Sequence, residues 1–498
     1  MISRRALISR RALILGGAAA GAAALAAPSA LGEGLPEAVD TLPPDAPQRH
    51  LSLVAAETEV PLLGAGKPAT SRFCAYNTTP FLTLRAPQGT RLMVDFENRL
   101  PDPTTVHWHG IRGPYIFDGV APITQPTVPP GGRFAYNVPL PDPGFYFFHP
   151  HCDETGQVGR GLVGLLFVED PADRKLGFDL EHIIAVKDWR LDEAGRFLTM
   201  FTDEGASTAG SFGTVRAVNG SPIPPRVEAP AYGDVRVRTI VADATRVIDF
   251  GCDVDEAAVI ACDGQATRPF LLNDAPDNVW RMGPAMRVDV HVRMPGPGQE
   301  VKIYDYRTAE PYLLTTLVAV DKGRKKTAFK PKALPVPKEL PLPDIAGASH
   351  LDFLVQTSAG ATAIAPPLPP DDPLAKALIE SRCVGDKTFW AINRTSWGAG
   401  ADLRLPPPLN VLKAGQSYVL SITNVTKHVH PMHLHGHVFK VLSSSKKKTL
   451  PQFLADTVIV EPNETVDIAF KAASGNWVFH CHILEHMDSG LMGWFRVA

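Results

Sequence analysis

The sequence lacks the features of three large protein classes. Its 49 basic and 52 acidic residues nearly balance, for a net charge of −3, so the charge pattern indicates no nucleic-acid partner. Beyond its N-terminus it has no apolar run long enough for a stable membrane span. Long amphipathic helical patterns are also scarce, and LAKALIES at 374–381 is the best candidate. A nucleic-acid-binding protein, an integral membrane protein and a mainly helical fold are therefore not expected.

Proline and glycine are abundant where helical patterns are not. The 498 residues include 47 prolines and 41 glycines but only 8% aromatic residues, a composition typical of short strands joined by turns. Apolar runs that alternate or are nearly continuous recur between turn clusters. Examples of these runs are RLMVDFEN, GLVGLLFVED, HIIAVKDW, YVLSITNV and TVDIAFKA. The pattern predicts an all-β protein, and the length predicts two to four sandwich-like domains.

Composition suggests where the domains begin and end. We expect a first domain over 45–170 and a second over 171–325, which contains no His-x-His pair. Residues 326–349 include KPKALPVPKELPLPD, which is typical of a proline-rich, extended linker. A third domain is expected over 350–498, with an irregular insertion around ATAIAPPLPPDDP.

The first thirty residues are expected to be a targeting segment. SRRALI occurs twice, at 3–8 and 9–14, and is followed by LGGAAAGAAALAAPSA. A twin arginine before a short, alanine-rich and mildly apolar stretch resembles a twin-arginine (Tat) signal peptide, with cleavage between Ala26 and Gly32. We therefore expect the Tat export machinery as a partner and a periplasmic or secreted location. That route transports folded proteins, which suits a protein that acquires metal before export.

Six cysteines leave several disulfide pairings open. Cys252 and Cys262 flank FGCDVDEAAVIACDG, which has the pattern of a hairpin, so these two thiols could face each other. Export permits disulfides, but spacing alone does not assign them. If the cysteine of the C-terminal HCH motif binds a metal, five cysteines remain and cannot all pair with one another. These five are Cys74, Cys152, Cys252, Cys262 and Cys383.

Ten of the sixteen histidines fall in four short clusters. These are HWH, HPH, HPMHLH and HCHILEH, with His107, His109, His149, His151, His430, His433, His435, His480, His482 and His486. Each cluster contains a His-x-His pair, and residues i and i+2 of a strand project from the same face about 6.5–7 Å apart. One such pair is more often structural than functional. Four such pairs would bury eight imidazoles, and without a ligand their lost hydration and hydrogen bonds would not be compensated. The clusters therefore predict metal sites.

Cys481 stands between two of these histidines. If His480 and His482 point into one pocket, alternation directs Cys481 to the opposite face of the strand. The thiolate and its two neighbours would then bind different metals that only a few covalent bonds separate. One cysteine with two histidines and a weak or absent axial ligand describes a blue-copper site. Zinc would accept the same ligands but has no redox chemistry.

These motifs resemble those of the multicopper oxidases, in the three-domain laccase-like bacterial type. HWHG, HPH, HPMHLHG and HCHILEH occur in the family's order, and FDGVAPITQ, AVNG, CDGQ and MGPAMRVDV are further matches. The resemblance implies three consecutive cupredoxin-like Greek-key β-sandwich domains and four coppers per chain. It implies that type 1 copper is held by His430, Cys481 and His486, and type 2 by His107 and His433. The type 3 pair would be held by His109, His149 and His482 on one side and by His151, His435 and His480 on the other.

The resemblance also implies a reaction. Electrons from a small-molecule or metal-ion donor would enter at type 1 copper and pass through Cys481 to the cluster, where dioxygen is reduced to water. Asp118 matches the family's carboxyl that supplies protons, although an aspartate before Gly119 could also simply begin a turn. Two positions depart from the family. Met487 replaces a glutamate found in many bacterial members, and Leu491 occupies the axial position where methionine is common.

Three functions remain open at this point. The first is a laccase-like oxidase of phenols and aromatic amines. The second is a cuprous or other metal-ion oxidase involved in copper tolerance. Such oxidases often carry a methionine-rich insert that collects Cu(I). The chain has nine methionines and no cluster of them outside the ligand region. The third is a copper-free structural relative, which the complete ligand set disfavours.

Overall fold

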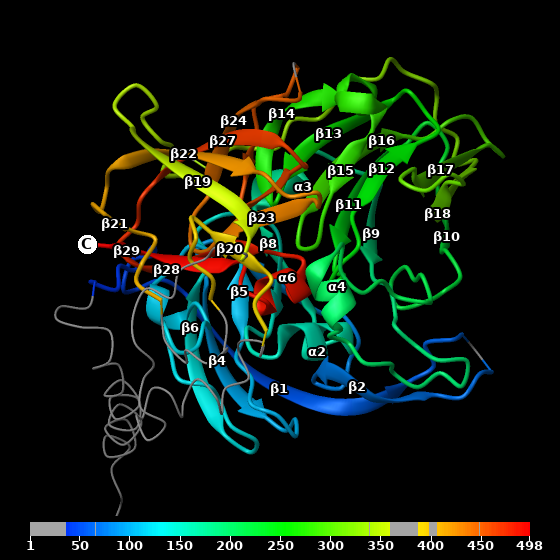
Figure 1. Ribbon diagram of the computed structural model, residues 1–498. Helices are drawn as coiled ribbons and strands as arrows, with labels where there is room; N and C mark the ends of the chain where they lie inside the picture. The colour runs from blue at the N-terminus through cyan, green and yellow to red at the C-terminus, as the bar shows by residue number, and fades with distance from the viewer. Residues whose placement is uncertain (1–35, 65, 338, 359–386, 398–405, 448) are drawn as a thin grey trace, which may run out of the picture.

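The computed structural model describes residues 36–498 except 65, 338, 359–386, 398–405 and 448. The expected signal peptide, the helix candidate at 374–381 and the insertion around 361–373 lie outside the described residues. The described chain is built mainly from strands in six sheets, which confirms the all-β prediction. Figure 1 shows the chain as three strand-rich bodies that meet near the centre of the molecule.

The first two sheets are formed by the N-terminal part of the chain. One sheet has the order β2 (Thr70–Tyr76), β1 (Gln48–Val60), β4 (Arg91–Asn98) and β6 (Arg133–Pro139). The other has the order β3 (Leu82–Pro87), β8 (Gly164–Glu169), β7 (Gly144–His149) and β5 (His107–His109). In β4 the alternation of RLMVDFEN buries Leu92, Val94 and Phe96 between the sheets. Period-two patterning therefore forms this sandwich.

The middle part of the chain forms a second pair of sheets. One has the order β10 (Arg226–Pro230), β18 (Tyr312–Val320), β17 (Glu300–Asp305), β12 (Ile248–Cys252) and β15 (Trp280–Met282). The other has the order β14 (Gln265–Leu271), β13 (Ala257–Cys262), β16 (Arg287–Arg293), β11 (Asp234–Val241) and β9 (Leu180–Val186). In β16 and β13 every residue is buried, because one face packs in the sandwich and other parts of the chain cover the second face.

The C-terminal part forms the third pair. One sheet has the order β20 (Trp390–Ile392), β19 (Ser349–Thr357), β22 (Ser417–Asn424), β27 (Glu464–Lys471), β24 (Phe439–Ser444) and β25 (Leu454–Ala455). The other has the order β21 (Asn410–Leu412), β29 (Met492–Val497), β28 (Gly475–Cys481), β23 (His430–Leu434) and β26 (Thr457–Val460). All strands of this third domain follow the extended segment 321–348, in which the structure has no helix or strand among the described residues.

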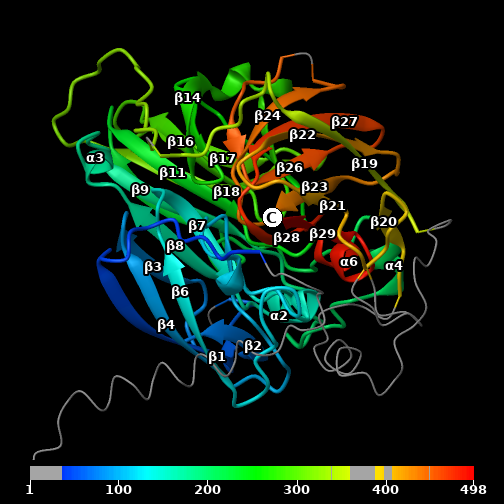
Figure 2. The same ribbon diagram turned by 90° about the vertical axis from the view of Figure 1, so that its left-hand side faces the viewer.

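Within the part of the chain that the structure describes, helices are few and short. They are η2 (Tyr115–Phe117), α2 (Glu154–Gly159), α3 (Pro171–Arg174), α4 (Asp203–Ser207), η3 (Leu272–Asp274), η4 (Pro276–Asn278) and α6 (Leu484–Asp488). Helix α6 contacts both α2 of the first domain and α4 of the second, and both views show the three helices at the place where the domains meet (Figures 1 and 2). The histidine-bearing strand ends lie next to this junction.

The expected pairing of Cys252 and Cys262 is wrong. Both thiols are free, as are Cys74 and Cys481, whereas Cys152 is disulfide-bonded. The physical reason is topological, because β12 and β13 are not a hairpin. The chain crosses from one sheet to the other between them, so the two cysteines are not cross-strand neighbours.

The proline-rich segment lies against the second domain and is not a free spacer. Leu334 is buried in a small cluster with Ile260 and Ala261 of β13, and Lys332 forms an ion pair with Asp234. The segment therefore lies in a defined path before β19 begins. The predicted domain boundaries themselves stay a prediction.

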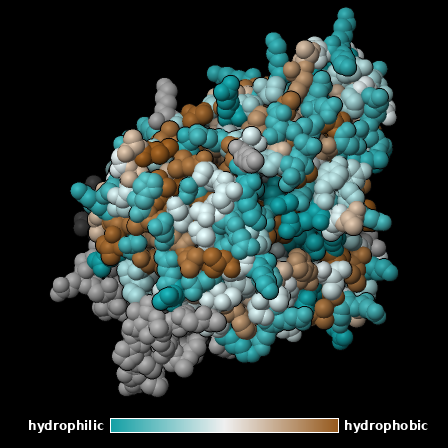
Figure 3. Space-filling view, turned by 45° about the horizontal axis from the view of Figure 1, so that its top comes forward, coloured by the Kyte–Doolittle hydropathy of each residue, from teal (hydrophilic) through white to brown (hydrophobic). Residues whose placement is uncertain are grey.

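One face of the molecule is largely polar. The face in Figure 3 is mostly hydrophilic, and hydrophobic side chains gather in its left part. Within the described residues, no helix has the length and apolar character that a membrane crossing needs.

Candidate metal centre

Four strand ends place the histidine clusters opposite one another in pairs. In the first domain β5 pairs with β7, so that His107 stands opposite His149. In the third domain β23 pairs with β28, so that His433 stands opposite His480. Of the other cluster histidines, His109 and His430 lie within β5 and β23, and His486 lies on α6. The rest follow directly after a strand: His151, His435 and His482. Each domain therefore presents two neighbouring strands with histidines at the same edge.

The structure brings the predicted ligands into four compact groups. In each group one potential ligand atom per residue lies within 4.8 Å of the others, and all members are buried. The groups are His107, His109 and His433; His109, His149 and His482; His151, His435 and His480; and His430, Cys481 and His486. Three of these groups combine residues from the first and third domains. The fourth belongs to the third domain alone.

The three groups that combine both domains form one pocket of eight histidines, here called the shared pocket. Unpartnered ring nitrogens show that this pocket fits metal ions. His107, His149, His151 and His433 each leave Nε2 buried without a hydrogen-bond partner, and both nitrogens of His482 are in the same state. In two of these histidines the other nitrogen is bonded to the backbone: Nδ1 of His107 donates to the Asp118 carbonyl at 2.7 Å, and Nδ1 of His149 to the Pro150 carbonyl at 2.8 Å. Orphaned buried nitrogens are costly in a core. Metal ions would satisfy them.

Burial also keeps the imidazoles in the form that binds metals. Desolvation lowers the pKa of His480 to about 3, and it places the pKa values of His149, His151 and His433 well below the usual range. Neutral imidazole is the form that binds metals, so these histidines can bind a cation without first losing a proton.

The group of His430, Cys481 and His486 fits one soft cation. The Cys481 sulfur lies 3.6 Å from Nδ1 of His430 and 3.7 Å from Nδ1 of His486, and these two nitrogens are 3.1 Å apart. An ion at the centre of such a triangle would lie about 2 Å from each atom, close to ordinary metal–ligand bond lengths. Burial raises the pKa of the Cys481 thiol well above its usual range, so a thiolate here requires a bound cation. The set is that of a copper site.

Comparison with known proteins agrees with this donor set. Two family models, both described as multicopper oxidase, match residues 63–173 and 383–498. Multicopper oxidase MmcO of Mycobacterium tuberculosis is 31% identical over 505 residues, which cover 97% of this chain and 95% of MmcO. The chain belongs to the multicopper oxidase family. It is therefore a copper-dependent oxidoreductase that uses dioxygen as the electron acceptor.

Further relatives support the fold of this multicopper oxidase. The solved multi-copper oxidase of Pseudomonas thermotolerans has a TM-score of 0.77 and 32% identity, and the match covers 91% of this chain and all of that one. The iron transport multicopper oxidase fetC of Epichloe festucae is 27% identical over 84% of this chain and 72% of its own length. The expectation of three cupredoxin-like sandwiches is confirmed.

The axial region of the cysteine-containing group is apolar in this multicopper oxidase. Leu491 is completely buried in the same core cluster as Cys481, and its carbonyl accepts from the Cys481 amide at 3.0 Å. Met492 stands opposite His480 in the β28–β29 ladder and packs in a different cluster. Met487 packs in that same cluster, with Val120 and Trp397. Neither of these two thioethers therefore shares a cluster with Cys481, and the position predicted as axial holds Leu491.

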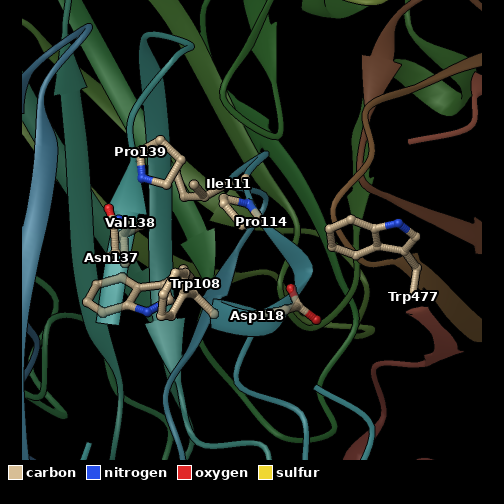
Figure 4. A pocket seen from close by; sticks show the side chains of 10 residues that line it. Trp108, Ile111, Pro114, Asp118, Asn137, Val138, Pro139 and Trp477 are labelled. Atoms are coloured by element: carbon tan, nitrogen blue, oxygen red, sulfur yellow. The ribbon is translucent and has the colours of Figure 1, made fainter. Parts of the chain in front are cut away.

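Asp118 lies at the edge of the shared pocket. Its Oδ2 accepts from Nδ1 of His435 at 2.7 Å, and its backbone carbonyl accepts from His107. A small cleft lined by Trp108, Phe117 and Trp477 reaches this carboxylate, and Figure 4 shows Asp118 between the two tryptophans. Gly119 is needed for the turn, because its φ is +86° and a Cβ would approach the Val106 carbonyl to 2.1 Å. Asp118 is both a turn residue and a partner of two ligands.

Sequence reasoning missed two other carboxylates of the shared pocket. Glu154 Oε1 lies 3.1 Å from Nδ1 of His151, yet neither carboxylate oxygen has a hydrogen bond. Burial, with a smaller contribution from Asp488, raises the pKa of Glu154 well above its usual range. Asp456 accepts from His109 at 3.0 Å. The position of Glu154 three residues after His151 was a usable signal, but Asp456 lies far from any ligand motif.

Proposed function

We propose that this enzyme is a laccase-like oxidase of phenolic or aromatic-amine donors. It would couple four one-electron oxidations at the group of His430, Cys481 and His486 to the reduction of dioxygen to water at the eight-histidine pocket. One observation supports this assignment above all. Two separate buried ligand sets are joined through three consecutive residues, because Cys481 belongs to one set and both its neighbours, His480 and His482, belong to the other.

The residues would hold four coppers, as the family resemblance implies. Type 1 copper would be held by His430, Cys481 and His486, and type 2 copper by His107 and His433. The type 3 pair would be held by the groups of His109, His149 and His482 and of His151, His435 and His480. Bound copper supplies the one-electron redox chemistry that links the donor to dioxygen. The backbone on either side of Cys481 provides a covalent path of a few bonds between the two pockets.

Protons would reach the shared pocket through Asp118. Reduction of dioxygen to two waters requires four protons, and the Asp118 carboxylate contacts His435 on one side and the cleft of Figure 4 on the other. A carboxyl group between solvent and the reacting site can accept a proton from one side and release it to the other. Asp118 is therefore the proposed proton-transfer residue.

The donor would meet the protein at Thr208. Nε2 of His486 donates to the Thr208 carbonyl at 2.8 Å, and the imidazole itself is completely buried. Thr208 is exposed and follows α4 of the second domain. The Trp390 ring lies 4.7 Å from the His486 ring and its Nε1 donates to the Ala206 carbonyl, which closes the other side. Donors would therefore transfer electrons through the Thr208 surface and not by touching His486.

A donor and metal assay of the purified protein tests this proposal. We expect four coppers per chain, an intense blue absorption from the copper–thiolate bond and oxidation of phenols with consumption of dioxygen. Copper content, visible and EPR spectra and a donor panel provide the readouts. A protein with full copper that oxidises Cu(I) or Fe(II) but no phenol or aromatic amine would contradict the laccase-like assignment.

Metal-ion oxidation is the second candidate, and one feature favours it. Asp203 and Glu204 are exposed on α4, close in sequence to the Thr208 carbonyl, and although Asp203 forms an ion pair with Lys387, the two carboxylates could attract cations. The relative fetC is an iron transport oxidase by name. Replacing Asp203 and Glu204 by Asn and Gln should lower kcat/KM for Fe(II) or Cu(I) selectively if metal ions are the donors. An equal effect on phenols and metal ions would count against a metal-ion site on α4.

We also propose export by the twin-arginine route to the periplasm or beyond the cell. The support is the repeated SRRALI before an alanine-rich stretch. Changing Arg4, Arg5, Arg10 and Arg11 to lysine should retain the protein in the cytoplasm. Unchanged export after cell fractionation would contradict this route.

A further inference from the structure

The second domain contributes no proposed copper ligand, yet it places a charged side chain against the aspartate that bonds two of them. Arg287 begins β16 within MGPAMRVDV, and Asp263 belongs to CDGQ after β13. The proposed reaction gives neither motif a role. Both side chains are almost completely buried, so their position requires an explanation in terms of their partners.

Arg287 contacts all three domains at once. Its Nη1 and Nη2 donate to Oδ1 and Oδ2 of Asp456 in the third domain, at 3.0 and 2.5 Å. Its Nε donates to the Phe145 carbonyl of the first domain at 3.2 Å. Its remaining bonds go to the carbonyls of Ala285 and Asp263 in its own domain. The two-pronged bond to Asp456 fixes the plane of that carboxylate.

Asp456 in turn holds one histidine from each ligand-bearing domain. Its Oδ1 accepts from Nε2 of His109 at 3.0 Å, and its backbone carbonyl accepts from Nδ1 of His433 at 2.8 Å. The two imidazoles are stacked with ring centroids 3.7 Å apart. The nitrogens left without a protein partner are Nδ1 of His109 and Nε2 of His433. Asp456 therefore selects which ring nitrogen of each histidine is available to a metal.

Asp263 and Gly110 surround the Arg287–Asp456 ion pair and leave room for it. The Asp263 carboxylate accepts from the backbone amides of Arg287, Asp456 and Thr457, at 2.8, 3.2 and 3.1 Å. Gly110, the last residue of HWHG, has a φ of +81°, and a Cβ there would approach Asp456 Oδ2 to 2.5 Å and Arg287 Nη2 to 2.8 Å. The glycine after His109 thus leaves room for the ion pair.

We propose that Arg287 is a positioning residue for the shared copper pocket: through Asp456 it sets the orientation of His109 and His433 across the domain interface. The second domain thereby controls a metal centre to which it supplies no ligand. A fully buried ion pair is a weak source of stability, because desolvation of both charges offsets their attraction. Its position against two ligands points to orientation as its role. The inference rests on the copper ligands assigned under the proposed function.

The test compares Arg287→Met with Arg236→Met. Arg236 is also buried and bonds Asp289 on β16, a carboxylate that keeps Arg238 as a partner, and it contacts none of the ligands. The readouts are copper per chain, the type 2 EPR signal and the blue band, before and after dialysis against graded chelator. Thermal unfolding of the copper-free proteins measures the purely structural cost of each change.

We expect Arg287→Met to keep the blue band but to bind copper in the shared pocket 10–100-fold more weakly, with an altered type 2 EPR signal, whereas Arg236→Met retains both. Arg287→Lys keeps the charge but not the two-pronged bond to Asp456, so its copper affinity should lie between those of the two methionine variants. The inference is overturned if Arg287→Met and Arg236→Met retain copper equally with the wild-type EPR signal. If Arg287→Met does not fold, Arg287→Lys decides, and an unchanged type 2 signal in it overturns the inference. A wild-type protein without a type 2 signal would instead overturn the ligand assignment.

Discussion

The two metal pockets differ in how they are assembled. His430, Cys481 and His486 come from one domain, on neighbouring strands and the short helix that follows them. The eight other histidines come from the first and third domains, and the second domain contributes Arg287 to their support. A pocket within one domain depends on a strand pair and a turn. A pocket between domains depends in addition on the orientation of whole sandwiches, so its geometry requires contacts that no single domain provides.

The pockets also differ in the carboxylates around them. Asp118, Asp456 and Glu154 each lie within ion-pair distance of histidines in the shared pocket. Among the described residues, no carboxylate lies at that distance from His430 or His486. This division suits a pocket that handles electrons alone and another that must also receive protons. The following predictions test that division, beginning with the largest expected effect.

Removing the thiol should abolish electron transfer between the two pockets. Cys481→Ser replaces a soft thiolate by a hydroxyl that binds copper poorly. We expect loss of the blue band and of the oxidase activity, whereas the copper of the shared pocket largely remains. Copper analysis and EPR of the purified variant measure both. A fully active serine variant would remove Cys481 from the electron path.

Removing the carboxylate of Asp118 should impair only the pocket that needs protons. Asp118→Asn preserves the shape but not the ionisable group, and general acid–base groups typically contribute at least about 10²-fold to the rate. We expect turnover with dioxygen to slow by about that factor, while stopped-flow reduction of the blue band by the donor stays fast. Unchanged turnover with an unchanged pH profile would leave Asp118 as a turn residue.

Weakening the contact between α6 and the segment around α4, which covers the cysteine-containing pocket, should change the kinetics with donors more than the kinetics with dioxygen. The Glu485 carboxylate accepts from the Thr202 amide at 2.9 Å and from the Ser211 hydroxyl at 2.8 Å, and so attaches α6 to the segment around α4. Glu485→Gln places an amide N–H₂ near these donors and should destabilise the fold by about 1–3 kcal/mol. We expect a changed KM for donors and an unchanged KM for dioxygen, measured by steady-state kinetics and thermal unfolding. Parallel changes in both KM values would contradict a local cover.

Changing the axial side chain should give the smallest effect. A methionine thioether stabilises Cu(II), whereas Leu491 offers no lone pair and excludes water. Leu491→Met nearly conserves volume, so the packing should survive. We expect a blue protein with a lower type 1 potential and slower oxidation of high-potential donors, measured by redox titration. An unchanged potential would show that residue 491 is not axial.

The sequence alone was enough for the fold class, the family and the grouping of histidines. The period-two alternation of strands such as RLMVDFEN is local, and so is the separation of Cys481 from His480 and His482 onto opposite faces. Local patterning failed at Cys252 and Cys262, where an apparent hairpin is a crossover between sheets. Whether two consecutive strands pair or separate depends on the packing of the whole sandwich, which spacing does not encode.

Asp456, Arg287 and Thr208 were decided by the tertiary structure. Each lies outside the ligand motifs. Asp456 is 347 residues from His109 and Thr208 is 278 residues from His486, and Arg287 reaches the pocket only through Asp456. Sequence motifs determined which residue types can bind copper, because ligand chemistry and strand alternation are local properties. Which nitrogen of each ring faces the metal, and what separates the donor from His486, depend on contacts between domains, and those exist only after the three sandwiches have packed.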